Sequence, residues 1–336
     1  MFKNIINWIG ANRKETNDSP AILKPQPENK VIETPKVLEK EADNNLYNFN
    51  VVSKEEMKKY PDAIMDMFTG KTDGFLIKNF MSIEDVDKLL ACLEEVRTNN
   101  GIQASSKVGF TYPTIFAEFS RKTAALSEEE KQAAAVRYYE EMEQFNNTFK
   151  EIYGVDALGQ ITDFFKSIGG NREVVQPKGS NKQGAFPFVT FRYLVPYQGL
   201  ITIHCGNYFG ATFNESYVEL NQQVRSTDQM SYFIMLQEPE EGGELSLFNF
   251  RWQEGQTKVS PEEDNEIIQP DGTKIYVQTD TSILKNKLRP QKGDMILFEG
   301  GNIWHRVETI KGNIPRITFG GFLSFSHDFE KIYFWS

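Results

Sequence analysis

Two histidines, and a glycine close to one of them, define the chemistry that this 336-residue sequence could perform. His204 opens the run His204-Cys205-Gly206, and His305 follows about a hundred residues later. Fe(II) is often held by two histidines and one carboxylate on one face, which leaves the other positions open for reactants. In this chain Gly206 takes the place of the carboxylate and offers no side-chain ligand atom. A bound iron would therefore have one extra position open to water or to an anion such as chloride.

A cation follows the second histidine at a useful spacing. Arg316 lies eleven residues beyond His305, and the turn residues between them predict an antiparallel hairpin. Such a hairpin would return Arg316 toward the start of the His305 strand, where its planar guanidinium could hold a carboxylate through two hydrogen bonds. Two histidines that bind one metal ion, with a buried cation beside them, would suit an oxo-acid cosubstrate.

A structural interpretation of the histidines stays open at this point. An isolated histidine on an apolar strand is more often a hydrogen-bonded core residue than a metal ligand. Strand alternation points Cys205 away from His204, so we expect a packed thiol rather than a third ligand. The third histidine, His327, follows the last predicted strand, and we expect it at the surface.

The elements that must position these residues are short strands. From residue 171 onward, short apolar runs alternate with turn residues, and we expect strands at 186–195, 200–204, 232–237, 244–250, 274–278, 294–298, 305–310 and 316–325. Regularly spaced strands with Gly and Pro between them favour an antiparallel sandwich or barrel. The predicted fold of residues 171–336 is therefore an all-β catalytic core, a jelly roll or double-stranded β-helix.

The chain before this core is predicted to be mainly helical. Over residues 46–170, helical patterns with capping signals predict helices at 53–67, 82–97, 127–153 and 156–167, with one strand at 74–80. Residues 1–45 are rich in Pro, Lys, Glu and Asn after a short apolar start, which predicts a flexible tail. The apolar segment 1–11 is too short to span a bilayer but could form a surface-docking helix. The whole chain is thus predicted to be α+β.

Composition and charge exclude several classes of protein. The chain is 39% hydrophobic and 25% charged, which is typical of a soluble globular protein. Its net charge is −10 and it has no block of Lys and Arg, so we expect no nucleic-acid partner. No segment is long and apolar enough to predict a transmembrane helix. Two cysteines far apart in sequence fit a reducing compartment, and we expect a cytoplasmic protein.

Four segments of the chain resemble the prolyl 4-hydroxylase-like branch of the Fe(II)/2-oxoglutarate dioxygenases. They are residues 73–86, 235–248, 290–298 and 304–316. The resemblance implies a double-stranded β-helix that binds Fe(II) and 2-oxoglutarate and reacts with O2. By position it makes His204 the proximal ligand, His305 the distal ligand, and Arg316 the residue that holds the carboxylate of 2-oxoglutarate.

This chain differs from that branch at Gly206, because the hydroxylases of the branch have Asp or Glu at the matching position. A His-x-Gly motif is similar to that of the Fe(II)/2-oxoglutarate halogenases, in which chloride or bromide takes the vacant position. This likeness implies that 2-oxoglutarate is decarboxylated to succinate while hydrogen is removed from an unactivated C–H bond, and halogen is then delivered to the substrate radical. The placement of the substrate carbon would decide which group it receives.

Two other functions remain compatible with the sequence. One is a hydroxylase or oxidase whose two-histidine site takes water or a substrate group as third ligand. The other is a non-catalytic relic of the fold, although such a relic has no physical reason to keep both histidines and the arginine. We expect a small-molecule substrate, with an amino-acid-like metabolite favoured by analogy, and the acidic chain allows a cationic one. Loops at 207–217 and 251–268 are predicted to act as lids.

Overall fold

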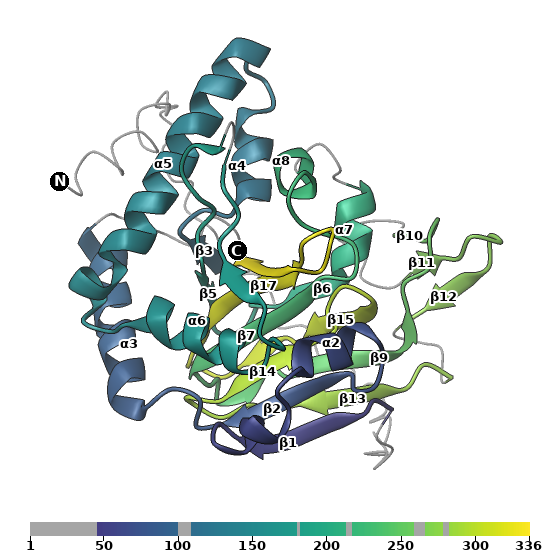
Figure 1. The fold of residues 1–336 in the computed structure, drawn as a ribbon. Coiled ribbons are helices and arrows are strands. Elements are labelled where there is room, and N and C mark those ends of the chain that lie inside the picture. Colours follow the sequence, from purple (N-terminus) through teal and green to yellow (C-terminus); the bar gives the residue numbers. More distant parts are fainter. Residues whose placement is uncertain (1–45, 100–108, 180–181, 213–216, 259–265, 278–281) are drawn as a thin grey trace, which may run out of the picture. The chain divides into compact units, whose positions relative to one another are not determined.

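The computed structural model describes residues 46–99, 109–179, 182–212, 217–258, 266–277 and 282–336 (Figure 1). The predicted tail at 1–45, with its apolar segment 1–11, lies outside the described residues. The described residues all belong to one compact unit. The predicted division at residue 170 falls inside this unit, and strands from before it join the main sheet.

The larger of two main sheets has nine strands in the order β1-β2-β14-β7-β17-β18-β4, with β5 beside β17 and β3 beside β5. The strands are β1 (Phe49–Ser53), β2 (Gly74–Lys78), β3 (Gly109–Tyr112), β4 (Glu173–Val175), β5 (Thr190–Leu194), β7 (Met230–Gln237), β14 (Met295–Phe298), β17 (Arg316–Phe325) and β18 (Lys331–Trp335). The pairs β1–β2 and β18–β4 are parallel, and the others are antiparallel.

The second main sheet has four antiparallel strands in the order β13-β9-β15-β6. They are β6 (Ile201–His204), β9 (Leu245–Arg251), β13 (Lys285–Leu288) and β15 (Ile303–Val307). Leu247 and Ile303 of this sheet share a buried cluster with Ile296 and Phe298 of the larger sheet. The two sheets therefore pack face to face as a jelly roll, which confirms the predicted fold class.

Smaller elements extend this core. A three-stranded sheet combines β10 (Thr257–Lys258), β11 (Glu266–Ile268) and β12 (Lys274–Tyr276), and a two-stranded sheet combines β8 (Glu241–Gly242) with β16 (Ile310–Lys311). The helices are η1 (Glu56–Lys59), α2 (Ala63–Phe68), α3 (Ile83–Asn99), α4 (Phe116–Thr123), α5 (Glu128–Tyr153), α6 (Ala157–Ser167), α7 (Gly206–Thr212) and α8 (Val218–Asn221). Among the described residues, no helix is long and apolar enough to cross a membrane.

Helices α3, α5 and α6 lie together on one side of the larger sheet (Figure 1). Their apolar faces and the strands β2, β7, β14 and β17 share the largest buried cluster, in which Leu89, Phe149 and Phe165 pack with Phe75 and Phe319. Because this side of the sheet is covered by helices, its other side is left for the four-stranded sheet. The catalytic candidates lie on that second side.

Capping residues placed two of the predicted helices correctly. The Ser127 side chain accepts a hydrogen bond from the backbone N–H of Glu130, the Glu130 carboxylate accepts one from the backbone N–H of Ser127, and α5 begins at the next residue. Asp156 caps α6 in a similar way through the N–H of Gly159.

The predicted helix at 53–67 is wrong as one element. Ser53 instead ends β1, which pairs in parallel with β2, and the helical part is divided into η1 and α2 with Pro61 between them. Proline cannot donate the backbone hydrogen bond that a continuous helix needs, and it crowds the preceding turn.

Candidate active site

His204 and His305 face each other across two neighbouring strands. They are register partners in the antiparallel pair β6–β15, so their side chains leave the sheet on the same face. The centroids of the two imidazole rings are 4.2 Å apart. The local sequence explains this placement, since both histidines follow apolar residues that anchor the strands in the core. Two residues far apart in the chain are thereby brought to one point.

The hydrogen bonds of both rings leave the same nitrogen available. The Nδ1–H of His204 donates to the carbonyl oxygen of Thr202 at 2.7 Å, and that of His305 donates to the carbonyl oxygen of Ile303 at 2.7 Å. A carbonyl oxygen can only accept, so each Nδ1 carries the proton and each Nε2 keeps its lone pair. Histidines that bind metals typically have their tautomer fixed by such a hydrogen bond from the ring nitrogen that does not bind the metal.

Both imidazoles are held in the neutral form that a metal ligand needs. Burial lowers the pKa of His305 to about 4, and the nearby Arg192 guanidinium acts in the same direction. Enclosure by protein atoms lowers the pKa of His204 well below its usual value, with a further decrease from His305. Aromatic rings, Phe209 beside His204 and Phe298 beside His305, enclose the pair.

Gly206 lies where a carboxylate ligand would be expected, and no other acidic group replaces it in the described part of the chain. There, no three His, Cys, Asp or Glu side chains gather in a metal-binding group. Gly206 begins α7, and its backbone N–H donates to the carbonyl oxygen of Gly300 at 2.9 Å. A Cβ atom at this position would lie 2.1 Å from the Nε2 of Gln229.

The helix α7 corrects one prediction. We expected a polar lid loop at 207–217, but its first residues belong to α7, while 213–216 and 259–265 lie outside the described residues. The helix forms because the N–H groups of Gly206 and Asn207 at its start are satisfied by the carbonyl oxygens of Gly300 and Gly301. The segment after His204 is therefore tied to the turn before β15.

Arg316 reaches the site from the opposite sheet, which corrects the predicted hairpin. β15 pairs with β6 and β9, whereas β17 pairs with β5, β7 and β18, so the chain passes between the sheets before Arg316. The Arg316 side chain is only 1% exposed, and its Nε and one terminal nitrogen have no hydrogen-bond partner among the described residues. Its guanidinium lies over the ring of Phe233.

One cavity joins the histidines, Gly206 and Arg316. Its volume is about 860 Å³, and residues of both main sheets line it. The charged side chains of its lining are Arg121, Lys122, Arg192, Arg316 and Glu118. The carboxylate of Glu118 is already paired with Lys122 at 2.8 Å. The cavity is therefore strongly cationic, and it suits anionic ligands.

These residues fit an iron and a 2-oxoglutarate. Two convergent neutral imidazoles with free Nε2 atoms could hold Fe(II), and the unpaired buried guanidinium of Arg316 could bind a carboxylate. An unpaired buried cation costs free energy, so its retention indicates an anionic ligand. The other sequence candidates lie apart: Cys205 is fully buried among apolar residues, where burial raises its pKa to about 12, and His327 is exposed.

The WelO5 family, described as carrier-protein-independent halogenases, has a sequence model that matches residues 46–336. The chain belongs to this family. The predicted resemblance to halogenases of the Fe(II)/2-oxoglutarate superfamily is thereby confirmed, and the chain is an enzyme of halogenase or dioxygenase type. The predicted cofactors, Fe(II), 2-oxoglutarate, O2 and chloride, agree with membership of the WelO5 family.

Solved structures similar to this WelO5-family chain are distant from it in sequence. An N-substituted L-amino acid dioxygenase from Burkholderia ambifaria AMMD, in complex with α-ketoglutarate, is 15% identical with a TM-score of 0.50, covering 81% of this chain and 90% of its own. A prolyl-4-hydroxylase from Pseudomonas putida is 12% identical with a TM-score of 0.33, covering 78% and 97%. No curated protein matches the sequence.

Two residues of this WelO5-family site were missed from the sequence. Arg192 lies on β5 between Thr190 and Leu194, and all three line the cavity. Its place on the inward-facing side of a predicted strand could have identified it from the sequence, because a charged residue that faces the core needs a partner. Gln229 gave no such signal, since only the fold brings it against Gly206.

Proposed function

We propose that this chain halogenates an unactivated C–H bond of a small molecule, using Fe(II), 2-oxoglutarate, O2 and chloride. The observation that carries the proposal is the convergence of two neutral imidazoles at 4.2 Å beside a glycine, in a cationic cavity. With two neutral protein ligands in place of two histidines and a carboxylate, the site lacks one negative charge. A halide could supply both that charge and the missing ligand.

Each residue has a defined part in this proposal. His204 and His305 would hold Fe(II) through Nε2, while the backbone carbonyls behind them keep the rings oriented. Arg316 would bind the distal carboxylate of 2-oxoglutarate and so orient it toward the metal. The bound iron supplies the oxidation of the C–H bond. The aromatic walls, Phe209 and Phe298, would exclude water from the reacting groups.

The substrate is proposed to be a free small molecule. The family description names carrier-protein-independent enzymes, and a cavity of about 860 Å³ has room for such a molecule beside 2-oxoglutarate. The cationic lining disfavours the basic substrate that the acidic chain allowed, because the field of one pocket can differ in sign from that of the whole protein. Free thiols at Cys92 and Cys205 agree with a reducing compartment, and we propose the cytoplasm.

The test uses the full-length protein loaded anaerobically with Fe(II) and 2-oxoglutarate. Titration with sodium chloride should shift the charge-transfer band of the iron, because the halide enters the coordination position that Gly206 leaves open. Turnover with O2 and a metabolite extract should then give new ions with a chlorine isotope pattern in mass spectra. A band indifferent to chloride, together with products that gain only oxygen, would establish a hydroxylase instead. Failure to bind iron at all would establish a relic.

A further inference from the structure

The space beside Gly206 is taken by the side-chain amide of Gln229. A Cβ atom at position 206 would lie 2.1 Å from Nε2, 2.8 Å from Cγ and 2.9 Å from Cδ of Gln229. These distances are far shorter than van der Waals contacts, so the amide lies where the first atoms of an aspartate at position 206 would be. An aspartate ligand at 206 and the present position of Gln229 therefore exclude each other.

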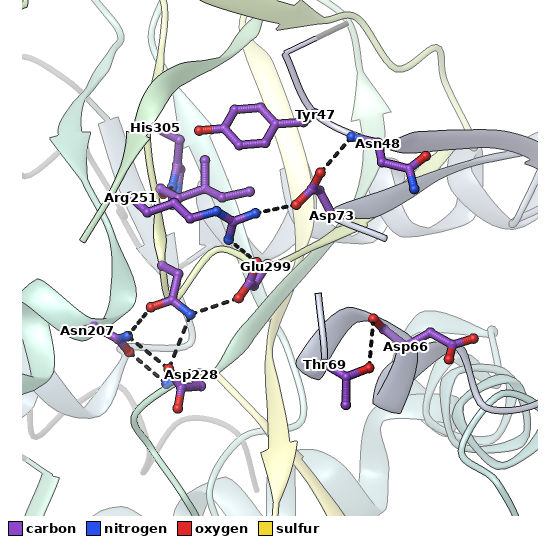
Figure 2. A network of polar contacts seen from close by, with 12 residues as sticks. Tyr47, Asn48, Asp66, Thr69, Asp73, Asn207, Asp228, Arg251, Glu299 and His305 are labelled. Carbon is purple, nitrogen blue, oxygen red and sulfur yellow. Dashed lines mark hydrogen bonds and ion pairs between the residues drawn. The ribbon is translucent and has the colours of Figure 1, made fainter. Parts of the chain in front are cut away.

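The residues next to this pair hold the two backbones together. The backbone N–H of Asp228 donates to Oδ1 of Asn207 at 2.8 Å, and Nδ2 of Asn207 donates back to the Asp228 carboxylate at 3.4 Å (Figure 2). Asp228 has a φ of 64°, which is uncommon for a residue with a side chain, and the bond to Asn207 supports it. Gly206 and Gln229, one residue away on each side, are thereby fixed next to each other.

The carbonyl end of the Gln229 amide lacks a hydrogen-bond donor in the described part of the protein. The residue is 1% exposed, and its buried Oε1 atom accepts no hydrogen bond there. Its side chain lines the same cavity as His204 and His305. A buried acceptor without a partner costs about 1–3 kcal/mol of folding free energy, so a donor such as water is expected to bind Oε1, which leaves Nε2 to donate to another group.

The charge of the surroundings indicates which kind of ligand this is. Arg192 and Arg316 both line the cavity that Gln229 lines. An anion is therefore favoured beside Gln229, and an anion requires an N–H donor rather than a carbonyl acceptor. The NH2 group already has this orientation, because Nε2 is the atom of Gln229 nearest to the position of a Cβ at residue 206.

We propose that the Gln229 side-chain amide donates a hydrogen bond to the halide bound at the position that Gly206 leaves open. Gln229 then acts as a halide-positioning residue: it replaces the missing carboxylate with a neutral donor that favours chloride at the metal. This inference rests on the proposed halogenase function and identifies a residue that makes the halide site selective for an anion.

The experiment compares chloride binding to the wild-type chain, Gln229→Ala and Gln229→Glu, with Gln132→Ala as a matched control on the exposed surface of α5. Each full-length protein is loaded anaerobically with Fe(II) and 2-oxoglutarate and titrated with sodium chloride in a sulfate buffer. The charge-transfer band reports the chloride Kd, a separate titration reports the 2-oxoglutarate Kd, and thermal unfolding confirms that each variant is folded.

Gln229→Ala should raise the chloride Kd by about tenfold or more, as expected for loss of one charge-assisted hydrogen bond, and change the 2-oxoglutarate Kd by less than about twofold. Gln229→Glu, which has nearly the same shape, should abolish chloride binding because its carboxylate repels the ion. This second variant decides the question if Gln229→Ala does not fold. Gln132→Ala should behave like the wild type.

Two results would overturn the inference. Unchanged chloride affinity in Gln229→Ala or Gln229→Glu would exclude the hydrogen bond, and weaker iron binding in Gln229→Ala with tighter binding in Gln229→Glu would make the side chain a metal ligand instead. A wild-type chain whose iron spectrum ignores chloride would contradict the proposed function itself, and the inference with it. The two failures are thus distinguished by the wild-type titration.

Discussion

At the scale of single residues, the site contains buried polar groups that lack hydrogen-bond or charge partners among the described residues. Arg316 is a buried cation without a full set of partners, and the amide oxygen of Gln229 is a buried acceptor without a donor among the described residues. Each costs free energy in the ligand-free protein. The cost of burying Arg316 is offset if an anion binds, so the ligand-free and loaded proteins should respond in opposite ways to its removal.

Arg316→Met tests this opposition directly. We expect the 2-oxoglutarate Kd to rise by roughly 30-fold or more, since truncating one partner of a buried charge pair costs about 2 kcal/mol at least. The ligand-free variant should be no less stable than the wild type, because methionine fills similar space without an unpaired charge. Isothermal titration and urea unfolding measure the two effects. A ligand-free variant that is clearly less stable would show that Arg316 is already satisfied by the protein.

Gly206→Asp tests the mutual exclusion of the two side chains. The single variant should lose about 1–3 kcal/mol of stability, as overpacked sites do, because the new Cβ collides with Gln229. The double variant Gly206→Asp/Gln229→Ala should recover most of this loss and bind iron without chloride dependence. Urea unfolding and the chloride titration measure these outcomes. Additive losses in the double variant would contradict the steric coupling of the two positions.

His305 should make the stability of the metal-free protein depend on pH. Its pKa is about 4 in the folded chain against an ordinary value of 6.5, so as pH falls through this window the unfolded chain takes up a proton that the folded chain does not. The stability from this residue is complete above pH 6.5 and falls by up to about 1.4 kcal/mol per pH unit below it. His305→Gln should lack this component in urea unfolding between pH 7 and 4.5; parallel pH profiles would contradict the shift.

At the scale of elements, a polar network behind the site connects α7 with the segments that precede β7 and β15. Asn302 accepts a hydrogen bond from Asn207 at 2.7 Å and donates to Asp228 at 3.2 Å and to Glu299 at 2.8 Å. Glu299 in turn pairs with Arg251, which also pairs with Asp73 before β2 (Figure 2). The segments that carry Gly206 and Gln229 are thus fixed to the frame of both main sheets.

Asn302→Ala should therefore affect both stability and halide binding. Loss of three side-chain hydrogen bonds should cost about 1–3 kcal/mol in urea unfolding, because Asn207 and Asp228 lose a shared partner. The chloride Kd should rise as the contact between Gly206 and Gln229 loosens. Asn249→Ala, an exposed residue of β9, is the control and should leave the chloride Kd unchanged. Equal chloride affinity in both variants would show that the network is only structural.

Local sequence was sufficient for most elements of the fold but not for their assembly. The strand at 316–325 and the helix that ends at Tyr153 match their predicted bounds, because alternation, the Ser127 capping box and turn residues are local signals. The sheet that Arg316 joins was mispredicted, since the same turn residues permit a hairpin or a crossing between sheets. The position of Gln229 beside Gly206 depends on contacts between distant segments, which no local pattern encodes.

At the scale of the whole molecule, the charge of the protein and the charge of its cavity have opposite signs. The chain carries a net charge of −10, whereas four cationic side chains and one acidic side chain line the cavity. The jelly roll makes this separation possible, because inward-facing strand positions can differ in charge from outward-facing ones. Arg192 is central to this field, since its charge lowers the pKa of His204, His305 and Arg316.

The variant Arg192→Gln tests whether the positive charge of the cavity favours anion binding. The substrate need not be known for this test. Removing one enclosed charge should weaken the binding of both 2-oxoglutarate and chloride by about 1 kcal/mol or more, roughly a fivefold rise in each Kd. The reason is that no described carboxylate neutralises Arg192. The loss should persist at high salt, since screening is weak inside a protein, and the surface variant Arg97→Gln should show no loss at any salt concentration. Titrations of both anions at low and high ionic strength measure this. If only the binding of 2-oxoglutarate became weaker, Arg192 would be a direct partner of that molecule rather than a source of the general field. If the binding of neither anion became weaker, the positive potential would have to come from the remaining cations.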